Sequence, residues 1–186
     1  MFFIKIIKFQ KFYMKIFYLI ILLLISSCSD HSIKSYSDEF PKIDLREFFN
    51  GKIYALGIVQ NRSGKVIKRF KVDIRAYWEG NTGYLDEKFI YSDGKKESRI
   101  WELKEISQSV YQGRADDVIG KANGKTAGNA FYFEYNLDLP VDDTTYEVKF
   151  EDWMFLLDKN TLLARSYMSK WGIGLGEVTI VMTKKG

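Results

Sequence analysis

Three polar side chains near the end of the chain fall on strand faces that are otherwise apolar. Asp152 lies in an alternating run, on the same face as Phe150. If the following "DKNT" segment makes a two-residue turn, Arg165 lies diagonally across from Asp152, and Tyr167 lies opposite it. The spacing therefore predicts an inward ion pair between Asp152 and Arg165, with the Tyr167 hydroxyl beside it.

A charge buried on an apolar face is costly unless it is paired, so this group has two interpretations. As a functional group, it would supply a polar contact for the headgroup of a ligand inside a largely apolar cavity. Aromatic side chains expected to face inward from other runs would line that cavity: Trp78, Phe133 and Tyr135. As a structural group, the ion pair would only lock two strands together.

The residue inventory argues against most enzymatic chemistry. His31 is the only histidine and Cys28 the only cysteine, so the chain cannot form a histidine-based triad or a multi-histidine metal site. We therefore expect no catalytic residues, no metal site and no cofactor. A small lipid-modifying enzyme that uses Asp152, Arg165 and tyrosines stays open as an alternative.

A glycine-rich segment, "GRADDVIGKANGKTAGNA", combines two acids with Gly120, Gly124 and Gly128. Asp116 and Asp117 are adjacent, and adjacent residues of a strand point to opposite faces, so these acids cannot act together. The glycines lack the spacing of a phosphate-binding loop, and no helix pattern follows them. We expect them to permit a β-bulge or a sharp curl of the sheet.

Cys28 stands at the boundary between an apolar run and a polar segment. Ten apolar residues, 16–25, precede the small pair Ser26 and Ser27, and four lysines precede the cysteine. Basic, apolar and small residues in this order are typical of a secretory leader, and ten residues are too few to span a bilayer as a helix. Because a lone cysteine has no disulfide partner, its position directly after the leader is the informative feature.

The segment "ISSC", from Ile25 to Cys28, resembles the bacterial lipobox. The resemblance implies that the Cys28 thiol is alkylated with a diacylglyceryl group, that residues 1–27 are removed, and that the new amino terminus is acylated. Two or more acyl chains anchor a protein stably, at ~0.8 kcal/mol per buried methylene. Ser29, rather than an aspartate, follows the cysteine. By resemblance to enterobacterial sorting, this serine implies anchoring in the outer membrane, facing the periplasm.

The excess positive charge of the chain lies in the leader. The sequence has 28 Lys and Arg against 24 Asp and Glu, and removal of the four leader lysines leaves equal numbers of each. A balanced charge gives no reason to expect nucleic acid as a partner. Residues 28–40 are polar and aperiodic beyond the cysteine, which indicates a tether, and 41–186 remain as one domain.

The domain itself is predicted to be all-β. A short helix comes first, with Asp44 as its N-cap and Gly51 as its stop. Alternating runs of apolar and polar residues then cover 65–80, 129–139, 145–157 and 177–183. Such runs, with turn signals between them, favour an antiparallel up-and-down meander of about nine or ten strands, curled into a barrel with the helix as a plug. A membrane-spanning barrel is the rival, but it needs an apolar outer face, and charged residues alternate along the long runs.

The segment "FFNGKIYALG", from Phe48 to Gly57, is similar to the beginning of lipocalin-like barrels. In that class a short helix closes one barrel end, and Gly, any residue, Trp and Tyr follow on the first strand. Gly51 and Tyr54 match this pattern, and Ile53 stands in the place of the tryptophan. The resemblance implies a lipocalin-like, or calycin-like, barrel.

From Pro41 to its end, the chain also resembles a family of uncharacterised proteobacterial lipoproteins that are catalogued as a domain of unknown function. The resemblance is carried by "REFFNGKIYALGIVQNRSGKV", "WEGNTGYLDEKFIYSDG", "GRADDVIGKANGKTAGNA" and "EDWMFLLDKNTLLARSYMSKWGIGLGEVTI". It implies one folded domain and envelope localisation, and it implies no activity.

Together these features favour a lipid-anchored envelope protein that binds an apolar or lipid-like molecule without catalysis. The inward aromatic side chains suit such a ligand, but they would equally fill the barrel. The alternatives are therefore a structural or envelope-assembly protein with a filled barrel and an outer partner surface, and the small lipid-modifying enzyme. The expected partners are the membrane that holds the anchor and this apolar ligand.

Cys28→Ala should block both processing and anchoring, because only the thiol can form the thioether that precedes cleavage of the leader. Cells labelled with an alkyne fatty acid should yield a labelled wild-type protein in the membrane fraction and an unlabelled, unprocessed variant. Equal labelling of the two proteins would rule out lipidation at this residue.

Overall fold

The computed structural model describes residues 32–141 and 144–185. Cys28, His31 and the leader, 1–27, lie outside the described residues. The described chain from Ile33 onward belongs to one compact unit. In this part of the chain, no helix has both the length and the apolar character needed to cross a bilayer.

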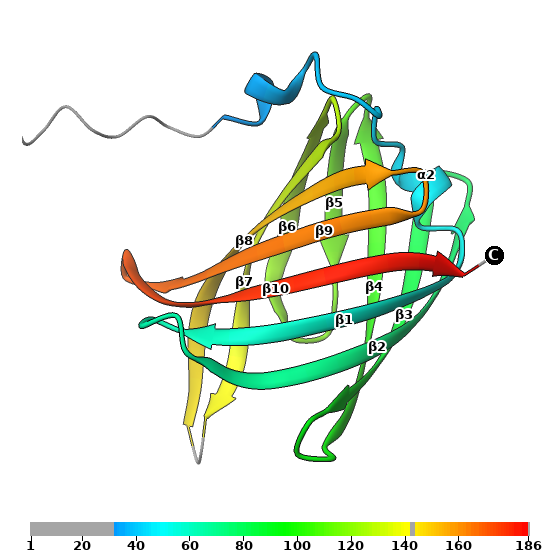
Figure 1. The fold of residues 1–186 in the computed structure, drawn as a ribbon. Coiled ribbons are helices and arrows are strands. Elements are labelled where there is room, and N and C mark those ends of the chain that lie inside the picture. The colour runs from blue at the N-terminus through cyan, green and yellow to red at the C-terminus, as the bar shows by residue number, and fades with distance from the viewer. Residues whose placement is uncertain (1–31, 142–143, 186) are drawn as a thin grey trace, which may run out of the picture. The chain divides into compact units, whose positions relative to one another are not determined.

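Ten antiparallel strands follow two short helical turns (Figure 1). The helical turns are η1, Ile33–Tyr36, and α2, Leu45–Phe48. The strands are β1 (Gly51–Asn61), β2 (Val66–Glu79), β3 (Thr82–Tyr91), β4 (Lys96–Ser107), β5 (Val110–Arg114), β6 (Val118–Ala127), β7 (Ala130–Val141), β8 (Thr144–Asp158), β9 (Thr161–Lys170) and β10 (Ile173–Lys185). Each strand pairs with the next one in the sequence, and β1 pairs with β10, so the sheet closes into a barrel. The predicted all-β, up-and-down barrel is confirmed.

Alternation along the strands sends every second side chain into the barrel. In β2, the buried residues Phe70, Val72, Ile74 and Ala76 alternate with exposed charged residues. Burial of each large apolar side chain contributes roughly 1.5–3 kcal/mol. The hydrophobic effect therefore fixes which face of each strand points inward.

The α2 turn closes one end of the barrel. Asp44 caps it, because its Oδ1 accepts hydrogen bonds from the backbone N–H groups of Arg46 and Glu47 at 2.8 and 3.1 Å. Leu45 and Phe48 are almost completely buried against the barrel core. The predicted plug helix and its Asp44 cap are confirmed, but the helix is a single turn that ends at Phe48, before the predicted stop at Gly51, which is the first residue of β1.

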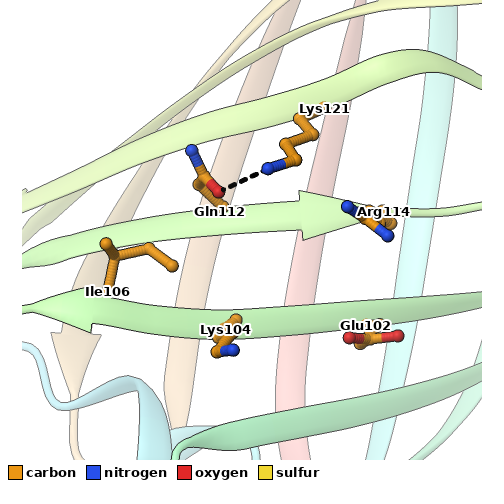
Figure 2. A pocket seen from close by; sticks show the side chains of 6 residues that line it. All are labelled: Glu102, Lys104, Ile106, Gln112, Arg114 and Lys121. Carbon is orange, nitrogen blue, oxygen red and sulfur yellow. Dashed lines mark hydrogen bonds between the residues drawn. The ribbon is translucent and has the colours of Figure 1, made fainter.

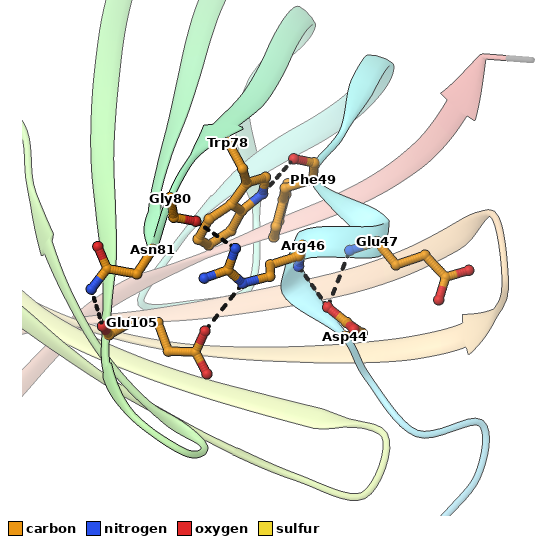
Figure 3. A network of polar contacts seen from close by, with 8 residues as sticks. All are labelled: Asp44, Arg46, Glu47, Phe49, Trp78, Gly80, Asn81 and Glu105. Carbon is orange, nitrogen blue, oxygen red and sulfur yellow. Dashed lines mark hydrogen bonds and ion pairs between the residues drawn. The ribbon is translucent and has the colours of Figure 1, made fainter.

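Polar contacts of Arg46 and Trp78 connect the α2 turn to the strands (Figure 3). The Arg46 Nε lies 3.1 Å from Glu105 Oε2, and its Nη1 donates to the Gly80 carbonyl at 2.6 Å. The indole Nε1 of Trp78 donates to the Phe49 carbonyl at 2.9 Å, and the Arg46 guanidinium lies over the indole ring. Side chains from α2, β2 and β4 thus meet a backbone carbonyl of the turn after β2 at the closed end of the barrel.

Glycines in the wall allow aromatic rings to lie directly against the backbone. A Cβ at Gly113 would lie 2.4 Å from Cζ of Phe133, and one at Gly57 would lie 2.2 Å from Cζ of Phe70. Both distances are below the 3.0 Å that real Cβ contacts respect. The rings occupy the space of the missing side chains, so the barrel interior is closely packed at these places.

The glycine-rich segment bends β6 as predicted. Gly120 has a φ of +73°, and the pairing of β6 with β7 shifts register between Ile119 and Asn123. Glycine adopts this left-handed backbone conformation without steric penalty. The expected bulge is confirmed.

A second bulge, in β8, overturns the predicted register with β9. The turn pairs Asp158 with Thr161, as the two-residue turn requires, but the next pair is Leu156 with Leu162. Leu157 is therefore an extra residue on β8. One extra residue in one strand of an antiparallel pair changes which residues lie opposite one another from that point on.

This shift removes Arg165 from the barrel interior. Asp152 pairs across the strands with Ser166, and Arg165 points to the outer wall. There its Nε and Nη2 lie 2.8 Å from the two carboxylate oxygens of Glu177. Tyr167 also lies outside and is 40% exposed. The predicted Asp152–Arg165 ion pair with Tyr167 beside it is wrong.

Gly113→Ala should destabilise the barrel, because the added Cβ would collide with the Phe133 ring. Overpacking of this kind lowers the free energy of unfolding by ~1–3 kcal/mol. Gly174→Ala is the matched control, since no heavy atom lies within 4 Å of a Cβ there, and it should unfold within about 0.5 kcal/mol of the wild type. Urea unfolding followed by tryptophan fluorescence measures both. Equal stability of the two variants would show that the interior has room at Gly113.

Candidate functional site

A cluster of polar side chains lies inside the barrel, and Asp152 on β8 is at its centre. Asp152 is 6% exposed, and Ser166 opposite it is equally buried. The hydroxyl of Tyr135 on β7 donates a hydrogen bond to Asp152 Oδ2 at 2.9 Å. Asp152 Oδ1 is buried and accepts no hydrogen bond within the described residues, although the nearby Ser166 hydroxyl lowers the pKa of this carboxyl. A buried acceptor without a partner costs ~1–3 kcal/mol, so a group that satisfies it would be stabilising.

Arg99 on β4 is the cation of the cluster. Its Nε lies 3.1 Å from Glu87 Oε2 on β3, and its Nη1 lies 3.4 Å from Asp117 Oδ2 in the turn after β5. The guanidinium also lies over the rings of Phe89 and Trp101. A single guanidinium is thus held by two carboxylates and two aromatic rings. Within residues 32–141 and 144–185, no three His, Cys, Asp or Glu side chains gather as metal ligands.

Burial controls the protonation of the acids in this cluster. Loss of hydration raises the pKa of Asp152 from 3.8 to about 6, although Ser166, Tyr135 and the positive charge of Arg99 all act in the opposite direction. Burial likewise raises the pKa of Glu87, against the opposing attraction of Arg99. The cluster holds more carboxylates than guanidinium groups, so its net charge favours uptake of a proton or of a positive group.

Aromatic rings frame the Asp152 carboxylate. The Tyr135 ring stacks on Phe150, with centroids 5.4 Å apart and an interplanar angle of 4°. It also contacts Trp101 and Phe133, with centroid distances of 5.2 and 5.6 Å. An apolar surrounding with one unsatisfied polar atom is the composition typical of small-molecule sites.

The structure divides the predicted site residues into three groups. The residues brought together in the cluster are Asp152, Phe133 and Tyr135. Trp78 also faces inward, but its indole is held by the plug at the closed end. The residues on the outer wall are Arg165 and Tyr167. The constellation considered for a lipid-modifying enzyme, Asp152 with Arg165, is therefore not assembled.

Four members of the cluster were not predicted from the sequence: Glu87, Arg99, Asp117 and Ser166. Glu87 and Arg99 each stand on the apolar face of an alternating run, which is the same anomaly that identified Asp152. That signal was available in β3 and β4. Ser166 had no such signal, because its direction depends on the bulge at Leu157.

A separate hollow lies on the outer wall over β4, β5 and β6 (Figure 2). Its volume is about 200 Å³, and its lining consists of Glu102, Lys104, Ile106, Gln112, Arg114 and Lys121. The one hydrogen bond drawn there runs from Lys121 Nζ to Gln112 Oε1 at 3.3 Å. Among the described residues, no unpartnered buried atom belongs to this lining. The interior cluster is therefore the stronger candidate site.

The family described as "Protein of unknown function (DUF3833)" matches residues 22–184. The chain belongs to this family. No curated protein matches the sequence significantly. The DUF3833 chain is similar in structure to the S-type phycobiliprotein lyase CPES from Guillardia theta, with a TM-score of 0.57 and 10% sequence identity over 77% of this chain and 94% of that one. At this identity the likeness concerns the fold alone, and it agrees with a lipocalin-like barrel.

A second solved structure, EF1p2_mFAP2b bound to DFHBI, is more distant. Its TM-score is 0.43 and its sequence identity 7%, over 74% of this chain and 94% of that one. The similarity is too low to support an argument about the DUF3833 chain.

Asp152→Asn should change how stability depends on pH. The Asp152 carboxyl has a pKa of about 6 in the folded protein against 3.8 otherwise, so between these values the folded state binds more protons than the unfolded state. As the pH falls from about 7.5 to about 4, the wild type should therefore gain roughly 2.5 kcal/mol of unfolding free energy relative to the variant.

Urea unfolding at several pH values measures this difference. Asp116→Asn is the control, since Asp116 is exposed, and its unfolding should follow the pH dependence of the wild type. A constant difference between the wild type and Asp152→Asn across this range would contradict a raised pKa for Asp152.

Proposed function

We propose that this protein is a lipid-anchored envelope protein that binds an apolar or lipid-like molecule in its barrel and does not transform it. The anchor would be the diacylglyceryl group expected on Cys28, and the location would be the periplasmic face of the outer membrane. The support for the anchor is the order of basic, apolar and small residues that ends in "ISSC".

The observation that carries the binding proposal is the orphan oxygen of Asp152. Oδ1 is buried inside an aromatic frame without a hydrogen-bond partner among the described residues. A ligand group that donates a hydrogen bond would satisfy this oxygen, and the apolar remainder would contact rings such as Phe133 and Phe150. The fold adds support, since closed barrels of similar strand number can hold one small ligand.

The charges of the cluster restrict the polar group of the ligand. Arg99 already contacts the carboxylates of Glu87 and Asp117. An anionic headgroup on the ligand would therefore have no free cation among the described residues of the cluster, and it would lie beside the carboxylate of Asp152. An acidic headgroup would therefore be repelled. A neutral or cationic donor, such as a hydroxyl, an amide or an ammonium group, matches the site.

A second candidate function is a structural or envelope-assembly role with a filled barrel. The close packing of the Phe70 and Phe133 rings against Gly57 and Gly113 favours it, because rings that touch the wall leave no space at those places. In that case, the buried Asp152 carboxylate would only fix the arrangement of β7, β8 and β9.

Native mass spectrometry of protein extracted from its own envelope separates these functions. The wild type should carry a non-covalent apolar molecule, and Asp152→Asn should carry at least ~10-fold less, because it loses a hydrogen bond to a charged acceptor. Arg165→Gln is the matched control, since its side chain lies on the outer wall, and it should carry as much as the wild type.

Denaturing mass spectrometry of the same samples distinguishes acyl groups on Cys28 from bound molecules. If none of the three proteins carries a non-covalent molecule, the filled-barrel function replaces the binding function. If Asp152→Asn retains as much as the wild type, the ligand does not use Asp152.

A further inference from the structure

An apolar stripe crosses the outer wall of the barrel over four adjacent strands. It consists of Phe155 on β8, Leu163 on β9, Val181 on β10 and Leu56 on β1. Each residue is the direct cross-strand partner of the next. Directly paired side chains on one face of a sheet lie about 4.5–5.5 Å apart at Cβ, so the stripe is a continuous surface.

The stripe is exposed at its β10 and β1 end, and its other two residues, Phe155 and Leu163, are half-buried. Leu56 is 55% exposed and Val181 is 42% exposed. Leu157, on the same outer face of β8, is 54% exposed. Contiguous exposed apolar side chains on a protein surface indicate a contact with another protein or with a membrane.

Basic side chains border the stripe on the side of β2. Lys71 pairs with Leu56, and Arg69 pairs with Ile58 on the same outer face. Further exposed basic residues on this part of the wall are Lys52, Arg75 and Lys185. The acids among them are Asp73, whose Oδ1 lies 3.4 Å from Lys185 Nζ, and Asp86 on β3, which pairs with Arg75. Because the whole chain without its leader lysines has balanced charge, this border is a local concentration of positive charge.

The chain that leads from Cys28 reaches the barrel at the other edge of the stripe. The Tyr36 ring of η1 contacts Phe155 and Trp153, with centroids 5.2 and 6.0 Å apart. Cys28 precedes Ile33 by five residues. Since an extended chain spans at most ~3.3–3.6 Å per residue, an anchor at Cys28 would hold Ile33 within about 18 Å.

We infer that the wall of β8, β9, β10 and β1, where strands lie side by side in Figure 1, docks on an anionic bilayer surface. The stripe would enter the boundary between headgroups and acyl chains, and the basic border would face anionic headgroups. The inference rests on the lipid anchor of the proposed function, which would bring this wall to the membrane. It does not depend on the ligand inside the barrel.

A second copy of the chain fits this wall less well than a bilayer does. A two-fold axis that runs along the stripe would place the basic borders of the two copies opposite each other, and like charges brought together oppose association. Anionic headgroups would instead neutralise Arg69 and Lys71.

Depth-dependent quenching on full-length lipidated protein tests the docking. The protein is reconstituted into vesicles of phosphatidylcholine and phosphatidylglycerol that contain a bilayer-embedded spin-labelled lipid. A fluorescent label is placed on Val181→Cys, with Ile100→Cys as the matched control, since Ile100 is an exposed apolar residue on the outer face of β4. Acylation of Cys28 leaves the introduced cysteine as the free thiol.

The label at position 181 should be quenched several-fold more strongly than the label at position 100. Arg69→Glu combined with Lys71→Glu should reduce quenching at 181 in these vesicles, and replacing phosphatidylglycerol by phosphatidylcholine should do the same. Equal quenching at 181 and 100 would overturn the inference. Strong quenching confined to a label on Trp171→Cys would also overturn it, because the barrel would then stand on the tip of the β9–β10 hairpin.

Failure of the anchor is recognised separately. Mass spectrometry of the same sample shows whether Cys28 carries acyl groups, and their absence contradicts the proposed anchoring. Quenching at 181 in a Cys28→Ala background, where the introduced cysteine is the one thiol, would support docking of this wall without the anchor. If the label at 181 is shielded from water but is not quenched by the spin-labelled lipid, and the protein cross-links as a dimer, this wall binds a second copy of the chain instead of the bilayer.

Discussion

The pairing of β1 with β10 is the constraint on which the rest of this structure depends. It runs from Lys52 with Lys185 to Asn61 with Gly176, and it leaves the barrel without an open sheet edge. Closure also creates an interior of limited size that the inward side chains must fill. The contact of Gly57 with the Phe70 ring follows from this limit, because a large ring fits only where the neighbouring strand supplies no side chain.

The same closure explains why the interior polar groups are costly. Asp152 on β8 points into the closed barrel, where it is 6% exposed. Its charge is opposed by burial and only partly supported by Tyr135 and Ser166. The negative charge of Glu87 has a closer cationic partner than that of Asp152, since Arg99 Nε lies 3.1 Å from Glu87 Oε2. The cluster therefore contains one close ion pair, Arg99 with Glu87, and two acids, Asp152 and Asp117, that each keep one buried oxygen without a partner among the described residues.

The sequence was a good guide where the two faces of a strand differ strongly. In β2, apolar and charged residues alternate almost without exception, and the predicted inward face from Phe70 to Trp78 is the observed one. In β9, both faces carry apolar residues, with Leu162 inside and Leu163 outside, so alternation could not decide between them. The turn residues predicted the first pair of the β8–β9 hairpin correctly, but they carry no information about an extra residue at Leu157 beyond it.

The extra residue, Leu157, decides which side chains of β9 point into the barrel and which lie on its outer wall. Without the bulge, the register of the two-residue turn would place Arg165 on the inward face, diagonally across from Asp152, as a cationic partner for that carboxylate. Ala164, rather than Leu163, would then stand opposite Phe155, and the outer stripe would be interrupted by a small side chain. With the bulge, Arg165 is neutralised outside by Glu177, Leu163 joins Phe155 to Val181 on β10, and Asp152 keeps an unoccupied acceptor. The unsatisfied interior and the continuous outer stripe are therefore two consequences of one local change in strand register.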